Sequence, residues 1–250
     1  MIRLVDLSLV DAFGRYCADK PFGIRMAAAL HSYGTDCSFA DFWLALDDDR
    51  IVGAISKLDD DMTLCADEMS EEISEFIFTV GFNTLTAERA ILESLGIESF
   101  SSCGAIMQYA GGYTCENLVG VDCSPSIMQA CRTLARCEGE SIRTGNFDRF
   151  YTDLALRVRR GTALCYGYGD KGVAVASAIT EGGVIIGGVA VIQGERKRGI
   201  GGALVSRLVC DMPRDKKIYL LRLSDENESF YKALGFENVG AWASISRGCE

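Results

Sequence analysis

The stretch that decides the fold of this chain is residues 189–204, VAVIQGERKRGIGGAL. Its first part is an apolar run rich in β-branched residues, which is typical of a buried strand. A basic, glycine-containing loop at 194–202 follows, and helical spacing then runs from Ala203 to Cys210. A strand, a glycine loop and a helix in this order allow backbone N–H groups to approach an anionic ligand closely.

Each part of this loop suits a pyrophosphate. Successive N–H groups in such a turn form a concave anion site, and the helix start adds unpaired N–H groups and the positive end of its dipole. Arg196, Lys197 and Arg198 add positive charge. A Walker loop is a poor match, because no Lys-Ser or Lys-Thr follows the glycines. A Rossmann fingerprint is also a poor match, because Leu204 stands where a third small residue is needed.

The pattern that remains is R-x-x-G-x-G, from Arg196 to Gly201, between an antiparallel strand and a helix. It resembles motif A of the GNAT superfamily of N-acetyltransferases, in which the amides of this loop hold the pyrophosphate of acetyl-coenzyme A. Residues 227–236, NESFYKALGF, resemble motif B of the same family and begin 26 residues after Gly201. Both motifs in this order, with one predicted strand between them, indicate a GNAT domain over residues 145–250.

The resemblance implies which residues bind the cofactor. Acetyl-coenzyme A is the implied cosubstrate, and no metal is implied. The expected contacts come from the strand end, the loop, the helix start and the second motif: Val189, Ala190, Val191, Arg196, Lys197, Arg198, Gly199, Ile200, Gly201, Gly202, Asn227 and Phe230. The loop departs from the commonest family pattern at Lys197, where Gly is usual, and at Gln193, where Pro is frequent. Neither change removes the amides that bind phosphate, so we expect an altered affinity rather than a lost site.

The same resemblance implies that Tyr231 is catalytic, as the proton donor to the leaving thiolate. The alternative is a packing residue beside Phe230 and Phe236. Asn227 is expected to hydrogen-bond the pantetheine arm, to cap the following helix, or both. A backbone N–H near Val191 is the implied oxyanion donor. No general base is evident, and four carboxylates are candidates by position only: Glu181, Glu195, Asp225 and Glu226.

These residues predict an N-acetyltransferase that moves an acetyl group from coenzyme A directly to an amine acceptor. The acceptor, a small molecule or a peptide amine, is not identified by the sequence. One alternative is a non-catalytic coenzyme A sensor or pseudoenzyme, against which the intact Tyr231 argues. Another is an interaction protein built from two GNAT-like domains, against which the basic loop argues. Four aromatic residues are expected either to line the acceptor side or to fill the core: Tyr166, Tyr168, Tyr219 and Trp242.

The expected elements follow a similar order in both halves of the chain: helix, antiparallel strands, helix, strand. The resemblance therefore implies an α+β (mixed α/β) fold, with a mostly antiparallel twisted sheet flanked by helices, in two tandem copies. We expect a degenerate GNAT-like domain at 1–120, a linker and helix at 121–144, and the acetyl-coenzyme A-binding domain at 145–250.

In the first half, residues 1–35 are expected to be helical, and Ile73–Val80 is expected to be a strand. The loop after this strand, Gly81–Thr86, has one glycine and no basic residue. We therefore expect it to hold no pyrophosphate. A helix is predicted from Ala87 to Leu95, with Thr86 as its N-cap.

Composition narrows the classes of function. The net charge is −10, and residues 1–140 hold 23 acidic and 9 basic residues, against 12 and 16 in residues 141–250. The acidic half argues against nucleic acid as a partner. His31 is the single histidine, which leaves little for a His-based triad or metal site. The 11 cysteines form no C-x-x-C pair and are expected to be reduced.

The chain shows no signal peptide and no run of 18 apolar residues. We therefore expect a cytoplasmic protein without a membrane segment. The oligomeric state, a homodimer included, is left open.

Overall fold

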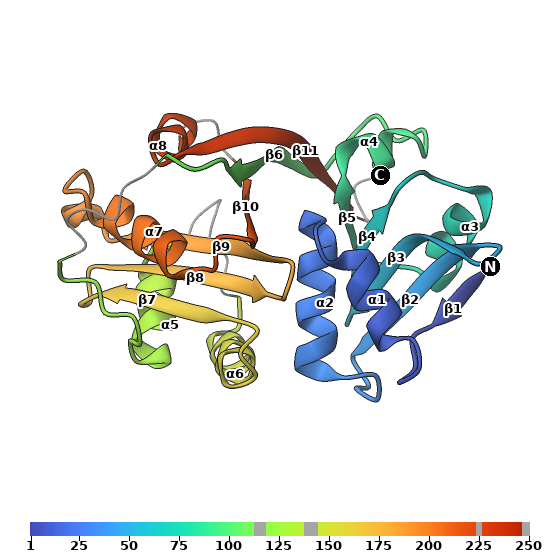
Figure 1. Cartoon of the computed structure of the whole chain (residues 1–250), viewed down its shortest axis with the longest axis horizontal. Helices are drawn as coiled ribbons and strands as arrows, with labels where there is room; N and C mark the ends of the chain where they lie inside the picture. The colour runs from blue at the N-terminus through green and yellow to red at the C-terminus, as the bar shows by residue number, and fades with distance from the viewer. Residues whose placement is uncertain (113–118, 138–144, 224–226, 247–250) are drawn as a thin grey trace. The chain divides into compact units, whose positions relative to one another are not determined.

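The computed structural model describes residues 1–112, 119–137, 145–223 and 227–246 (Figure 1). Its contacts divide the chain into two compact units. The first comprises Met1–Ile106 together with Val239–Glu250, and the second comprises Met107–Asn238. This division assigns the end of the chain to the first unit, whereas the domain bounds predicted from the sequence assign it to the second domain. Those bounds stay a prediction.

The first unit is a sheet with helices on it. Its elements are β1 (Ile2–Leu4), α1 (Val10–Cys17), α2 (Pro21–Tyr33), β2 (Ala40–Asp47), β3 (Arg50–Leu58), β4 (Asp61–Ala66), α3 (Glu71–Val80), β5 (Thr84–Glu88), α4 (Arg89–Glu93) and the start of β6 (Ser102–Tyr109). The strand order is β1-β2-β3-β4-β5-β11, in which β11 spans Phe236–Ser246. Neighbouring strands in this order pair antiparallel, except that β4 and β5 pair parallel.

Three expectations for the first half were wrong. Residues 73–80 belong to helix α3, because Ser70 Oγ accepts a hydrogen bond from the Ile73 amide (3.2 Å) and caps the helix. Ile73 and Ile77, one turn apart, are both buried. Residues 2–4 form strand β1 rather than part of a helix. Thr86 lies in β5, and Glu88 is the N-cap of α4.

The second unit repeats the order of the first. Its elements are α5 (Ile127–Arg136), α6 (Phe147–Arg159), β7 (Leu164–Tyr168), β8 (Gly172–Ile179), β9 (Gly183–Val191), a 3₁₀ turn (Gln193–Glu195), α7 (Ile200–Asp211), β10 (Lys217–Arg222), α8 (Glu228–Ala233) and the start of β11 (Phe236–Ser246). The strand order is β11-β6-β10-β9-β8-β7. Helix α7 packs on one face of β8 and β9, and α5 and α6 pack on the other (Figure 1). The α+β fold class in two tandem copies is confirmed.

Strands β6 and β11 each contribute to both units. In the first unit, Trp242–Ser246 of β11 pair antiparallel with Thr84–Glu88 of β5, and Ala243 is fully buried. Thr86 Oγ1 donates a hydrogen bond to Ser244 Oγ across this pair (3.1 Å). In the second unit, Met107 at the end of β6 is fully buried in the core beside α7. Each unit therefore contains a strand segment from the other half of the sequence.

Three further observations concern cysteines, membranes and metals. Eight cysteines of the described segments are free thiols, four of them buried, whereas Cys210 is disulfide-bonded, which differs from the expectation of reduced cysteines.

No described helix is long and apolar enough to cross a membrane. Within the same segments, no group of three or more His, Cys, Asp or Glu side chains could hold a metal ion.

Candidate functional site

The second unit has a pocket where two parallel strands part. β9 and β10 pair in register from Gly183 with Lys217 to Ile186 with Leu220, and the register ends there. Beyond that point a pocket of about 90 Å³ opens between them. It is lined by Ile186, Gly187, Gly188, Val189, Leu220, Leu221, Arg222, Leu223, Asn227 and Tyr231.

A β-bulge shapes one wall of this pocket. Val175 of β8 pairs with Gly188, but Ala176 pairs with Ile186, so Gly187 is left out of the ladder. Only glycine fits there, because a Cβ would lie 2.1 Å from Ser177 Oγ. A bulge leaves backbone groups unpaired and re-aims them. The bulge is thus a second candidate donor to an oxyanion, four residues before the predicted Val191.

The loop after β9 presents open amides. Lys197 has φ +62° and Gly199 has φ +82°, and Gly199 is the N-cap of α7, so no side chain caps this helix. The Ala203 amide donates to Gly199 O (2.9 Å). Helix geometry leaves the preceding amides, those of residues 200–202, without intrahelical acceptors. These N–H groups suit a phosphate, as the sequence predicts.

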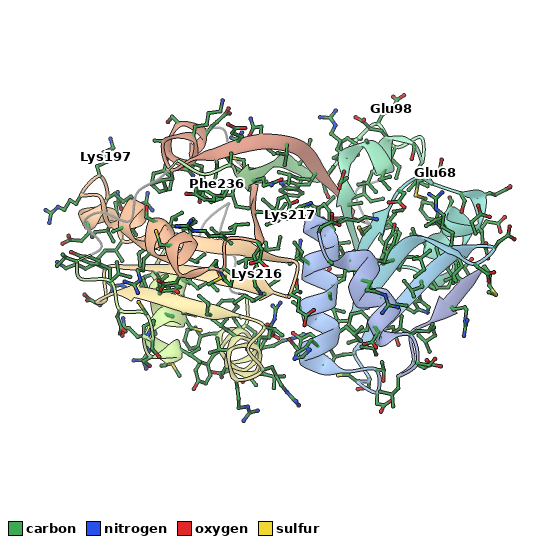
Figure 2. All side chains as sticks on the ribbon, in the orientation of Figure 1. Glu68, Glu98, Lys197, Lys216, Lys217 and Phe236 are labelled. Carbon is green, nitrogen blue, oxygen red and sulfur yellow. The ribbon has the colours of Figure 1, made fainter. Side chains whose placement is uncertain are left out.

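The three basic residues of the loop differ in their contacts. Arg196 Nε donates to Val191 O (3.0 Å) and so ties the loop to the end of β9. Arg198 pairs with Glu195 (3.0 Å), which Lys171 also approaches (3.7 Å). Lys197 is exposed at the outer end of the loop (Figure 2). Glu195 is therefore an ion-pair partner of two basic residues, and its role as a possible base stays untested.

Gly201 lies where three elements of the second unit meet. A Cβ at this position would lie 3.4 Å from Phe230 Cζ and 3.7 Å from Val191 Cγ2. The start of α7, the end of β9 and the ring on α8 therefore converge, and Phe230 lies beside the phosphate loop. Gly202 has more space, since its Cβ would meet only Leu234 Cδ2 at 3.8 Å.

Tyr231 both packs and lines the pocket. Its ring centroid lies 4.9 Å from that of Phe230 and 5.9 Å from that of Phe236. Burial raises the pKa of the Tyr231 phenol to about 12. The hydroxyl therefore stays protonated at neutral pH, as a proton donor must. The two roles considered for Tyr231, proton donor and packing residue, are compatible, because the ring packs while the hydroxyl can donate.

Glu228 links helix α8, which carries Tyr231, to neighbouring strands. Its carboxylate accepts hydrogen bonds from Arg222 (2.9 Å), Lys232 (2.6 Å) and Asn238 (3.2 Å), which lie on β10, α8 and β11. The hydrogen bond from Lys232 and the charge of Arg222 hold the pKa of Glu228 below its usual value. Arg222 was not predicted from the sequence as part of the site. Its one sequence signal is that a charged residue ends the apolar strand β10.

The remaining sequence candidates are less central. Asn227 lines the pocket and occupies the N-cap position of α8 without a side-chain cap hydrogen bond, and its contact with the pantetheine arm stays a prediction. No carboxylate is among the described lining residues. Glu181 is exposed in the turn before β9. Asp225 and Glu226 lie outside the described residues.

The four aromatic candidates for the acceptor side do not line the pocket. Tyr166 and Tyr219 are buried, and Tyr166 donates its hydroxyl hydrogen bond to Asp211 (2.9 Å). Tyr168 packs against the core beside α7. Trp242 belongs to the first unit, where it pairs with Glu88.

The first unit has an acidic counterpart of the phosphate loop. Because 73–80 is helical, the segment between the third strand of its meander and the next helix is Asp67–Ser70, not Gly81–Thr86. Ser70 already caps α3, and Glu71 and Glu72 occupy its first turn. Asp67 pairs with Lys20 (2.7 Å). At this segment an anion would be repelled by the acidic side chains, and the start of α3 is already capped by Ser70.

We therefore predict one coenzyme A per chain. Calorimetric titration of the whole protein with coenzyme A should give a stoichiometry near one, since basic residues precede the uncapped start of α7, whereas Ser70 caps the counterpart helix and acidic residues fill its first turn. A Gly201→Val variant should then bind coenzyme A at least about 100-fold more weakly. A stoichiometry of two would indicate a second site, and undiminished binding by the variant would show that the pyrophosphate is not held at the start of α7. Either result would contradict this account.

Comparison with known proteins gives consistent results. Residues 159–238 match the model of the acetyltransferase (GNAT) domain. No curated protein matches the chain significantly. The fold resembles a tandem GNAT protein from the clavulanic acid biosynthesis pathway (TM-score 0.60, 14% identity, covering 100% of this chain and 99% of that one).

Two further solved structures are similar. One is a GNAT-family acetyltransferase from Colwellia psychrerythraea (TM-score 0.59, 12% identity, 98% and 99% covered). The other is a GCN5-related N-acetyltransferase from Sphaerobacter thermophilus (TM-score 0.58, 14% identity, 98% and 94% covered). At these identities the likeness establishes the fold of the whole chain.

Proposed function

We propose that this protein transfers an acetyl group from acetyl-coenzyme A directly to an amine acceptor, because residues 159–238 match the acetyltransferase (GNAT) domain model and the fold resembles that of a tandem GNAT protein. The observation that carries the proposal is the juxtaposition of two features in one unit. The uncapped start of α7 suits the pyrophosphate, and a Cβ on Gly201 at this start would lie 3.4 Å from Phe230, the neighbour of the pocket-lining Tyr231.

The residues present fit the cofactor along its length. The loop and the amides at 197–202 are assigned to the pyrophosphate. Val189, Ala190 and Val191 follow the point where β9 leaves β10, so their backbone groups are assigned to the amide-bearing pantetheine arm. Asn227 and Phe230 are assigned to the opposite wall.

When bound, acetyl-coenzyme A supplies a thioester whose carbonyl carbon accepts the amine and whose sulfur leaves as a thiolate. Backbone N–H groups of β9, at the Gly187 bulge or near Val191, are assigned to the oxyanion. The Tyr231 phenol donates its proton to the sulfur. Because no carboxylate lines the described part of the pocket, we assign removal of the amine proton to water.

Two measurements test this function. Coenzyme A at about 100 times its dissociation constant should stabilise the protein by about 2.7 kcal/mol, which a thermal shift detects. Acetyl-coenzyme A incubated with the protein and small amines or peptides should then release thiol only with the correct acceptor class. Stabilisation without thiol release across the whole panel would favour the coenzyme A sensor instead. No stabilisation would contradict both proposals.

A further inference from the structure

The end of β6 and the residues after it form part of the unit that carries the candidate site. Met107 is fully buried beside α7, and Tyr109 packs against the same core. Both residues precede the GNAT-matching segment by some fifty positions in the sequence. The segment Met107–Gly111, here called the brace, is therefore a structural part of the second unit.

Three aromatic rings in contact link the brace to helix α8. The Tyr109 ring centroid lies 5.4 Å from that of Phe236, and the Phe236 centroid lies 5.9 Å from that of Tyr231. Phe236 is 1% exposed and lies in the interior (Figure 2). The three rings thus connect the brace to the proposed proton donor without an intervening gap.

The brace also meets the end of α8 through the backbone. Ala110 N donates to Gly235 O (2.8 Å). Gly235 has φ +86°, and a Cβ there would lie 2.3 Å from Gly111 O and 3.0 Å from Tyr109 Cε2. Gly235, which follows the C-cap residue of α8, is therefore in contact with the brace.

We propose that Tyr109 is a positioning residue for Tyr231, acting through Phe236, and that the brace and Glu228 hold the two ends of α8. The helix has six residues, too few to be stable alone, so tertiary contacts set its position. Glu228 fixes its start through Arg222, and the contact of Gly235 with Ala110 fixes its end. The inference rests on the proposed function, because it assumes that the place of Tyr231 matters for catalysis.

The first test compares Tyr109→Ala with Tyr109→Phe in the full chain. Ring-labelled tyrosine gives an NMR signal for Tyr231, assigned by its absence from Tyr231→Phe. Tyr109→Ala should shift this signal, and Tyr109→Phe should leave it in place because the ring is kept. Calorimetry with coenzyme A should give the same affinity for both variants as for the parent.

Turnover supplies the second reading. With an amine that releases thiol from acetyl-coenzyme A, Tyr109→Ala should lower kcat about tenfold or more, since small misplacements of catalytic groups have effects of this size. KM for acetyl-coenzyme A should hardly change. In a Tyr231→Phe background, Tyr109→Ala should have little further effect, because its target hydroxyl is already gone.

A matched pair of glycines tests the backbone contact. Gly235 and Gly161 both follow a helix C-cap with positive φ (+86° and +76°), and both amides bond the helix end at 3.0 Å. A Cβ at Gly161 would meet nothing within 4 Å. Gly161→Ala and Gly235→Ala therefore carry similar backbone strain, but only Gly235→Ala should displace the Tyr231 signal. If Gly235→Ala fails to fold, the Tyr109 pair still decides.

The outcomes separate the two proposals. An unmoved Tyr231 signal and an unchanged kcat in Tyr109→Ala would overturn the positioning role while leaving the acetyltransferase proposal intact. If the parent binds no coenzyme A, the proposed function fails, yet the NMR comparison still reports whether the brace holds α8. A shift that is equal in Gly161→Ala and Gly235→Ala would also count against the brace.

Discussion

Replacing Gly201 with Val should reduce coenzyme A affinity at least about 100-fold, or about 2.7 kcal/mol, with the fold retained. The residue lies in the first turn of α7, among the amides assigned to the pyrophosphate. A Cβ here already reaches contact with Phe230 and Val191, at 3.4 and 3.7 Å. The two further methyl groups of Val would have to enter the space of these side chains or that of the phosphates. Isothermal calorimetry with coenzyme A measures the loss directly.

Gly201→Ala is the matched control. It adds only the Cβ, whose two contacts are at ordinary van der Waals distance, so it should bind within a fewfold of the parent. Helix content by circular dichroism should be the same for both variants, because Val is only a modestly weaker helix former than Ala. If Gly201→Val binds coenzyme A as tightly as Gly201→Ala, the pyrophosphate is not held at the start of α7.

The site loop is predictable from the sequence because its signals are local. The glycines and basic residues at 196–202 lie next to each other in the chain, and the helix and strand that flank them have regular spacing. Asn146 as the cap of α6 is another local signal, with its side chain accepting from the Arg149 amide (3.0 Å). Such features need no knowledge of distant residues.

Helix α3 was predicted wrongly although its signal is present. Its β-branched and aromatic content favours a strand. However, Ile73, Phe76, Ile77 and Val80 recur at spacings of three and four, and Ser70 stands at the cap position. Periodicity and capping outweigh composition here, because together they bury one face and satisfy the helix start. The correction also moves the counterpart of the phosphate loop to Asp67–Ser70.

Three features lack a local signal that could specify them. The pairing of β5 with β11 joins Thr86 to Ser244, which are 158 positions apart, and neither segment has a sequence feature that identifies the other as its partner. The burial of Met107 in the second unit is of the same kind. Arg222 enters the pocket wall through an ion pair with Glu228 that depends on how α8 docks. Two adjacent glycines, Gly187 and Gly188, are compatible with a bulge in a strand, but its position depends on the partner strand.

Removing the hydroxyl of Tyr231 should have the largest effect on chemistry. Tyr231→Phe keeps the ring beside Phe230 and Phe236, so packing and coenzyme A affinity should stay close to those of the parent. General acid catalysis typically contributes ~10²–10⁴-fold, so kcat should fall at least about tenfold even if water partly substitutes. Pre-steady-state thiol release from acetyl-coenzyme A with a competent amine measures the chemical step.

The pH dependence sharpens this test. Burial raises the pKa of the Tyr231 phenol to about 12, so its proton is retained throughout the neutral and mildly alkaline range. A proton donor loses activity only as pH rises through its own pKa. The parent should therefore show no decline assignable to Tyr231 below about pH 11, and the ratio of parent to Tyr231→Phe rates should stay constant from pH 7 to 10. A ratio that falls toward one within that range would show that the Tyr231 phenol loses its proton there and would contradict the raised pKa. A Phe variant as fast as the parent at every pH would reduce Tyr231 to a packing residue.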